Sequence, residues 1–106
     1  FSFPSTGYWL VATNVAFNGE YLSSYNSGHL LTTTDNSSYA NAVLVETSHE
    51  GNVGNSCATQ NHIFDVTNTS NCKFKLNWGA QSSSIAIVGN TDKTRTGITV
   101  IRLTDT

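Results

Sequence analysis

Two cysteines and three histidines are the side chains of this sequence best suited to bind a metal ion. His49, Cys57, His62 and Cys72 are candidate ligands, but their spacing matches no compact zinc motif. A ring of histidines around a symmetry axis is a separate way of holding an ion, and it stays open for His29, His49 and His62. We therefore expect no metal site within the chain itself and no cofactor.

Cys57 and Cys72 could instead form a disulfide, which would contribute about 3 kcal/mol in the chain-entropy model. A direct hairpin between the strands that carry them would hold the two residues too far apart to bridge. A chain that crosses between sheets there leaves the geometry open. In the alternating segment "CKFKLNW", Cys72 shares a face with Phe74, Leu76 and Trp78. This pattern favours a small buried core residue over a bridged one.

Acidic and nucleophilic side chains give little support for catalysis. The seven Asp and Glu residues form no pair suited to glycoside cleavage, and no G-x-S-x-G motif is present. The loops "TDNSS" and "NTDKT" resemble calcium loops, but each contributes one Asp where calcium usually takes several carboxylates. Turns closed by Asn and Asp side chains explain these loops better. The sequence predicts a protein that is not an enzyme.

Three tyrosines, Tyr21, Tyr25 and Tyr39, lie in or beside Ser- and Asn-rich segments of the first half of the chain. Tyrosine offers a flat apolar ring and a hydroxyl, while Asn, Ser and His add adaptable hydrogen bonds. This mixture predicts a binding site for a sugar or a polar cell-surface epitope. The alternative is that these tyrosines simply cap the ends of the fold.

Strands must position all of these residues. The chain has 15 Thr, 13 Ser and 12 Asn among its 106 residues, while Glu, Lys, Gln and Arg, which favour helices, are scarce. Turn clusters such as "SYNSG" and "GNTDKT" separate the apolar segments. The strands are expected at 8–17, 28–34, 40–47, 57–66, 72–78, 84–88 and 95–104. Strands at this spacing predict an all-β, antiparallel sandwich of two sheets that forms a single domain over 1–106.

The charge pattern and the length of the apolar runs argue against two classes of partner, nucleic acids and membranes. The net charge is −2 and the five Lys and Arg residues are scattered over the last third of the chain, so we expect no nucleic-acid binding. No apolar run is long enough to predict membrane insertion. The first residue, Phe1, is not an initiator Met, which indicates a processed chain or a part of a longer one.

The first and last strands are apolar on both faces. In 8–17, Trp9, Val11, Val15 and Phe17 alternate with Tyr8, Leu10, Ala12 and Ala16. In 95–104, Ile98 and Val100 alternate with Ile101 and Leu103. A domain of this size has one core between its sheets, so an apolar outer face needs another partner, most simply a second copy of the chain. The interface is expected at Tyr8, Leu10, Ala12, Ile101 and Leu103.

Several phrases resemble known viral and complement head domains. "FPSTGYWLVATNVAF" resembles the opening strand of the trimeric jelly-roll heads related to the complement collagen head and to tumour necrosis factor, where a Pro-x-x-Gly-Tyr turn leads into a long aromatic strand. "IFDVTNTSNCKFKL" and "GNTDKTRTGITVIRLTDT" are similar to C-terminal head domains of structural proteins of marine bacteriophages. The resemblance covers essentially the whole chain and is weakest over 20–56.

This resemblance implies a ten-strand-class jelly roll that forms a homotrimer, with the first and last strands near the threefold axis. It also implies a place at the distal, C-terminal end of a virion protein such as a tail fibre or spike. The partners would be other copies of the chain, other virion proteins, and a host surface glycan or protein.

Three functions remain open on the sequence. The first is a virion head that attaches to a host receptor, and the second is a purely structural capsid-decoration or fibre-tip trimerisation domain. The third is a secreted complement-type recognition domain, for which Asn36 and Asn68 would be glycan acceptors in N-x-S sequons.

Overall fold

The computed structural model describes residues 1–19, 23–50 and 54–106, and these form seven strands and no helix. Within these residues there is accordingly no helical segment long and apolar enough to cross a membrane. Every strand expected from the sequence is present, with ends displaced by a few residues. The strands are β1 (Gly7–Gly19), β2 (Ser23–Thr33), β3 (Ala40–Glu50), β4 (Gly54–Val66), β5 (Lys73–Ala80), β6 (Ile85–Ile87) and β7 (Gly97–Thr104).

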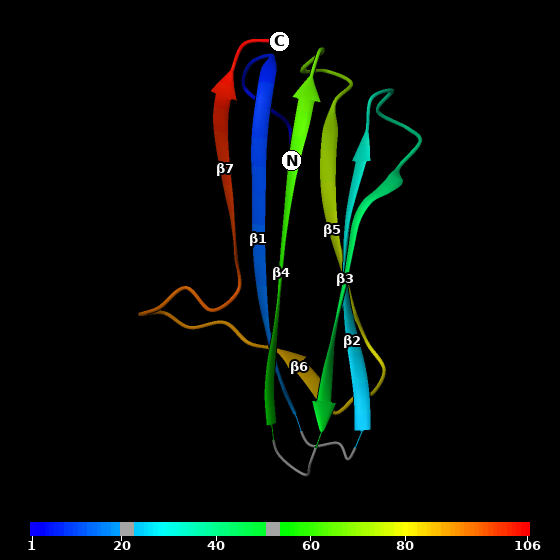
Figure 1. The fold of residues 1–106 in the computed structure, drawn as a ribbon, viewed down its shortest axis with the longest axis vertical. Helices are drawn as coiled ribbons and strands as arrows, with labels where there is room; N and C mark the ends of the chain where they lie inside the picture. Colours follow the sequence, from blue (N-terminus) through cyan, green and yellow to red (C-terminus); the bar gives the residue numbers. More distant parts are fainter. Residues whose placement is uncertain (20–22, 51–53) are drawn as a thin grey trace.

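The strands form two antiparallel sheets (Figure 1). In the first sheet, β1 is central, pairs with β4 on one side, and pairs with β6 and β7 on the other. In the second sheet, β2 lies between β3 and β5. The prediction of an all-β chain with two antiparallel sheets is confirmed. The described residues give seven strands where the resemblance implied a ten-strand class, and the jelly-roll topology stays a prediction.

Alternation along the strands builds the core between the sheets. Odd-numbered residues of β1 from Trp9 to Phe17 point inward and are buried, while the even-numbered ones are half-buried or exposed. The larger core cluster combines aromatic and aliphatic side chains of both sheets: Phe3, Trp9, Val11, Leu30, Phe64, Val66, Cys72 and Phe74. The prediction that Cys72 is a small core residue is therefore confirmed.

A second, smaller cluster lies further along the strands and contains Val15, Phe17, Ala58 and Ile85, with Val45 and Trp78 packed against it. Between the two clusters, Thr13 of β1 pairs with Gln60 of β4, and both side chains are buried. The core is thus two apolar regions separated by a polar pair.

The turns are closed by side-chain oxygens, as the sequence predicts. The Asp35 carboxylate accepts hydrogen bonds from the backbone amides of Ser37 (2.8 Å) and Ser38 (2.7 Å) and from the Thr33 hydroxyl (2.8 Å). Asn68 Oδ1 accepts hydrogen bonds from the backbone amides of Ser70 and Asn71. Asn90 Oδ1 accepts one from the backbone amide of Asp92. These oxygens are occupied by the chain's own amides, which explains the loops without an ion.

One edge of the first sheet is split into two strands. β6 and β7 both pair with the same edge of β1, and the chain between them leaves the sheet as the protruding loop 88–96 (Figure 1). At the base of this loop the Thr96 hydroxyl donates to the Val88 carbonyl (2.8 Å) and accepts from the Ala16 amide (3.1 Å). The Val88 amide donates to the Ala16 carbonyl (2.8 Å), so the loop closes where it leaves the sheet.

Candidate functional site

A row of three apolar side chains crosses the outer face of the first sheet. Leu10 of β1 pairs with Ile63 of β4 on one side and with Ile101 of β7 on the other. Paired residues of antiparallel strands point to the same side of a sheet. Since the odd-numbered residues of β1 fill the core, this row must point away from it. We call the row and its neighbours the apolar face: Tyr8, Leu10, Ala12, Ile63, Ile101 and Leu103.

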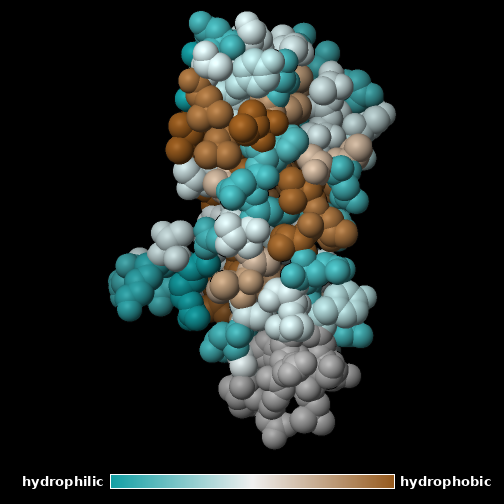
Figure 2. All heavy atoms as spheres, in the orientation of Figure 1, coloured by the Kyte–Doolittle hydropathy of each residue, from teal (hydrophilic) through white to brown (hydrophobic). Residues whose placement is uncertain are grey.

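Most of the apolar face is open to solvent. Ile63 is 60% exposed, Leu103 50%, Ile101 48% and Tyr8 38%, and Leu10 is half-buried. Figure 2 shows hydrophobic atoms gathered over the upper parts of β7, β1 and β4. Single exposed apolar residues are common on soluble proteins, but a contiguous group on three neighbouring strands is typical of an interaction surface.

One carboxylate lies at an end of the apolar face, and no charged side chain lies in its central row. Asp65 pairs with Tyr8, one step beyond the row, and its Oδ1 atom is covered without a hydrogen-bond donor among the described residues. Arg102 pairs with the core residue Trp9 and therefore lies on the other side of the sheet, where its Nε donates to the Thr6 carbonyl (3.0 Å). An apolar centre with a polar rim is the usual composition of a protein–protein interface.

The structure gathers the expected interface residues in one region. Tyr8, Leu10 and Ala12 lie on the outer face of β1, Ile101 pairs beside Leu10, and the exposed Leu103 lies at the bulge in the β1–β7 pairing. Sequence reasoning missed Ile63, which is the most exposed member. The alternation in "HIFDV" could have revealed it, because Phe64 and Val66 fill the core and Ile63 must therefore point outward.

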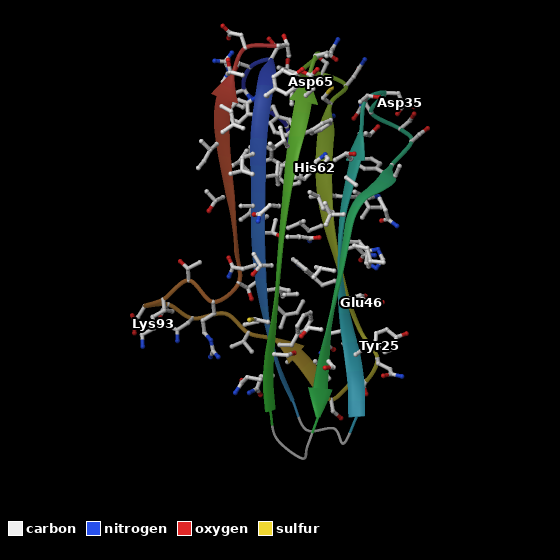
Figure 3. The ribbon with its side chains drawn as sticks, in the orientation of Figure 1. Tyr25, Asp35, Glu46, His62, Asp65 and Lys93 are labelled. Carbon is white, nitrogen blue, oxygen red and sulfur yellow. The ribbon has the colours of Figure 1, made fainter. Side chains whose placement is uncertain are left out.

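Two of the three candidate tyrosines lie at opposite ends of the β2–β3 hairpin. Tyr25 lies within β2 opposite Ser48, whereas Tyr39 precedes Ala40, which pairs with Thr32 at the other end of the same hairpin. Figure 3 shows Tyr25 near the lower end and Asp35, in the turn before Tyr39, near the upper end. Tyr39 is half-buried, with the Lys75 ammonium 4.1 Å from its ring centre. Tyr21 lies outside the described residues.

The sulfur and imidazole groups are also dispersed. Cys57 is exposed on the outer side of β4, Cys72 is buried, and both are free thiols. Among the side chains that the structure describes, no three His, Cys, Asp or Glu residues converge to form a metal site. The side chain of His49 is not among those described. His62 contacts the ring of Phe64, and burial lowers the pKa of its imidazole. His29 Nδ1 lies 3.3 Å from Asn41 Oδ1 on the outer side of the second sheet.

In comparisons with known proteins, no family model, curated protein or solved structure matches the chain.

Proposed function

We propose that the chain is the homotrimeric head of a virion appendage, such as a bacteriophage tail fibre, and that it attaches the particle to a host surface glycan or protein. The observation that carries the proposal is the apolar row Ile63–Leu10–Ile101, exposed on a sheet whose other side already has a core. Water contact with this row is unfavourable by roughly 25 cal/mol per Å² of apolar surface. Association of copies would remove that surface from water.

Two features favour another copy of the chain as the partner. The apolar face combines the first and last long strands, which the resemblance to trimeric heads places near a threefold axis. The central row carries no charge, so three copies can meet there without like-charge repulsion, while Asp65 stays at the rim.

Attachment by such a head would be multivalent. Each trimer presents three sets of end loops, and each virion carries several heads, so individually weak sites add up to firm binding. The protruding loop 88–96 and the turn at Asp35 are the prominent surface segments available for contact.

Native mass in solution tests the assembly. We expect light scattering after size exclusion to give three times the chain mass of 11.4 kDa, independent of dilution over the micromolar range. A monomer at every concentration would contradict the proposal. The trimer would then be applied to a glycan array and to bacterial cells, with competition by unlabelled domain as the control for specific attachment.

A purely structural role, as a fibre-tip trimerisation or capsid-decoration domain, is the second candidate. It is favoured by the separation of Tyr25 and Tyr39, because these tyrosines cannot act together on one ligand within a single chain. A stable trimer that binds neither glycans nor cells would favour this role over attachment.

A further inference from the structure

The two sheets close along one edge and diverge at the other. β3 and β4 approach each other closely, whereas β5 and β7, at the opposite edges of the two sheets, stay apart. Ile98 of β7 pairs with the buried Thr13 and therefore points to the inner side of the first sheet, yet it is 52% exposed. The second sheet thus leaves the inner side of β7 uncovered at this position.

β5 is the edge strand of the second sheet on this open side. It pairs with β2 along one edge. Along its other edge the described residues contribute only the bridge between Ser2 and Lys73 and the hydrogen bonds of Phe1 with Phe74. The rest of that edge, residues 75–80, has no proline and no bulge, and its one charged residue is Lys75. Prolines, bulges and charges are the usual means of blocking an edge strand, so this stretch is suited to accept another strand.

The pairing of Phe1 with Phe74 sets the direction and register of such a strand. The Phe1 amino group donates to the Phe74 carbonyl (2.9 Å), and the Phe74 amide donates to the Phe1 carbonyl (3.4 Å). This exchange of two bonds is the pattern of an antiparallel hydrogen-bonded pair. Because backbone groups alternate between the two edges of a strand, the N–H and C=O groups of Leu76 and Trp78 point to the same open edge. A strand in line with Phe1 would run antiparallel to β5 and bond to both residues.

A cleft between β5 and β7 would receive the side chains of this strand. Its volume is about 310 Å³, and it is lined by uncharged residues of both sheets: Asn14, Leu76, Trp78, Thr96, Gly97 and Ile98. Paired residues of antiparallel strands point to the same side of a sheet, so residues opposite Leu76 and Trp78 would enter the cleft. Its largest side chains, on Leu76, Trp78 and Ile98, favour apolar residues at these alternate positions, because a charged one would lose its hydration there. The position opposite Lys75 points outward and favours an acidic residue.

A single extended segment fits this edge better than a second folded copy of the chain. Thr96 and Gly97, which line the cleft, lie at the base of the loop 88–96, and this loop projects from the sheet (Figure 1). A folded copy placed against β5 would have to accommodate the projecting loop, whereas an extended peptide is only one strand wide, about 4.8 Å.

We propose that the open edge of β5 binds an extended peptide segment as a fourth strand of the second sheet, antiparallel to β5 and with alternate apolar side chains in the cleft between Trp78 and Ile98. In this mode of recognition main-chain hydrogen bonds give affinity, and pockets for alternate side chains give specificity. The cleft lies on the inner side of β7 and the apolar face on the outer side of the first sheet, so the inference does not depend on the proposed trimer.

Amide hydrogen exchange, followed by NMR, tests the proposal with an end-blocked peptide Val-Thr-Val-Thr-Val-Glu, which places valines opposite Ala80, Trp78 and Leu76. In the chain alone, the Leu76 and Trp78 amides should exchange faster than those of Lys75 and Asn77, which face β2. The peptide at millimolar concentration should slow exchange at Leu76 and Trp78 several-fold and change the other two less. No slowing at Leu76 and Trp78 would overturn the proposal. Slowing that grows with chain concentration in the absence of peptide would assign the edge to a second copy and would also overturn it.

Two changes separate strand pairing from apolar contact. The peptide Val-Thr-Pro-Thr-Val-Glu lacks the N–H that would donate to the Trp78 carbonyl, and we expect it to bind at least tenfold more weakly. Ile98→Asp puts a charge in the cleft at an exposed position and should weaken binding of the first peptide to a similar extent. Leu44→Asp, at a position 53% exposed on the outer side of β3, is the matched control and should bind as wild type. Equal binding of the two peptides, or unchanged affinity in Ile98→Asp, would overturn the proposal.

Discussion

The outer faces of the two sheets have the same geometry and opposite chemistry. Across the first sheet a row of paired residues reads Ile63–Leu10–Ile101. The corresponding row across the second sheet reads Asn77–His29–Leu44. Both sheets fill the core with the alternate set of side chains, so the core does not explain the difference. The second face is suited to water, whereas the first is suited to another protein surface.

Exchange of the chemistry of the first row should have the largest effect. Ile63→Asn with Leu10→His gives β4 and β1 the polar residues found in the second sheet, and it removes about 1.5–3 kcal/mol of burial per side chain from the assembled state. We expect the proposed trimer to dissociate to folded monomers, measured by light scattering and circular dichroism. Leu44→Asn is the matched control, since Leu44 is 53% exposed on the other sheet, and it should leave the mass unchanged. Dissociation by the control alone would reverse the assignment of the two faces.

The opposite exchange should create a second adhesive face. Asn77→Ile with His29→Leu makes the row on the second sheet as apolar as Ile63–Leu10–Ile101. We expect association beyond the wild-type mass that grows with protein concentration, followed by analytical ultracentrifugation. Unchanged mass at high concentration would show that an apolar row is insufficient for association and would weaken the inference from the first face.

Acid should lower the free energy of unfolding in two separate pH ranges, one set by His62 in the first sheet and one set by Asp35 at the end of β2. Burial lowers the pKa of His62 in β4, so the folded chain binds fewer protons there than the unfolded chain, and stability falls as the pH drops through the ordinary histidine range. Hydrogen bonds from the Ser38 and Ser37 amides and the Thr33 hydroxyl hold the pKa of Asp35 well below its ordinary value. Its contribution is complete above the ordinary carboxyl range and is lost as the pH falls through and below that range.

Urea unfolding as a function of pH measures both effects. His62→Phe should flatten the stability curve between neutral and mildly acidic pH, and Asp35→Asn should flatten it in the carboxyl range. The same curve in wild type and His62→Phe would show that the imidazole does not contribute.

The smallest effect is expected on the polar face. Lys75→Met keeps most of the side-chain stem over Tyr39 but removes the ammonium group from its ring, at a cost of about 0.5–1 kcal/mol. Urea unfolding of monomeric protein measures the loss, and Lys93→Met, on the exposed loop 88–96, is the control. A larger loss in the control would contradict a stabilising role for the Lys75–Tyr39 contact.

Local patterns were sufficient to predict the strands and most of the apolar face. Thr, Val and aromatic residues with period-two alternation placed all seven strands, and the two-sided apolarity of the terminal strands identified Leu10 and Ile101. Local alternation in "HIFDV" turns Ile63 outward, but only the pairing of β4 with β1 places it beside Leu10. The same limit applies to two of the predicted tyrosines: Tyr25 and Tyr39 are close in sequence, but the β2–β3 hairpin places them at opposite ends.

The buried polar pair between the two core clusters could not be predicted from sequence patterns for a related reason. Thr13 and Gln60 each look like ordinary polar positions within a β-rich segment, and only their pairing beside Ile98 shows them as one buried row. Gly28 likewise depends on a distant residue, because it pairs with Trp78, whose indole ring occupies the space that a Cβ at position 28 would fill.

The closure at the base of loop 88–96 has a consequence for how this protein can change over generations. Thr96 and Val88 complete the bonding of β1 where the loop departs, and the Arg95 carbonyl accepts a hydrogen bond from the Asn14 side chain (2.7 Å). Among the described residues, 89–94 make no hydrogen bond to the sheet. The length and composition of this segment can therefore change while the first sheet keeps its structure. The surface that loop 88–96 presents can therefore vary independently of the sheet that carries it.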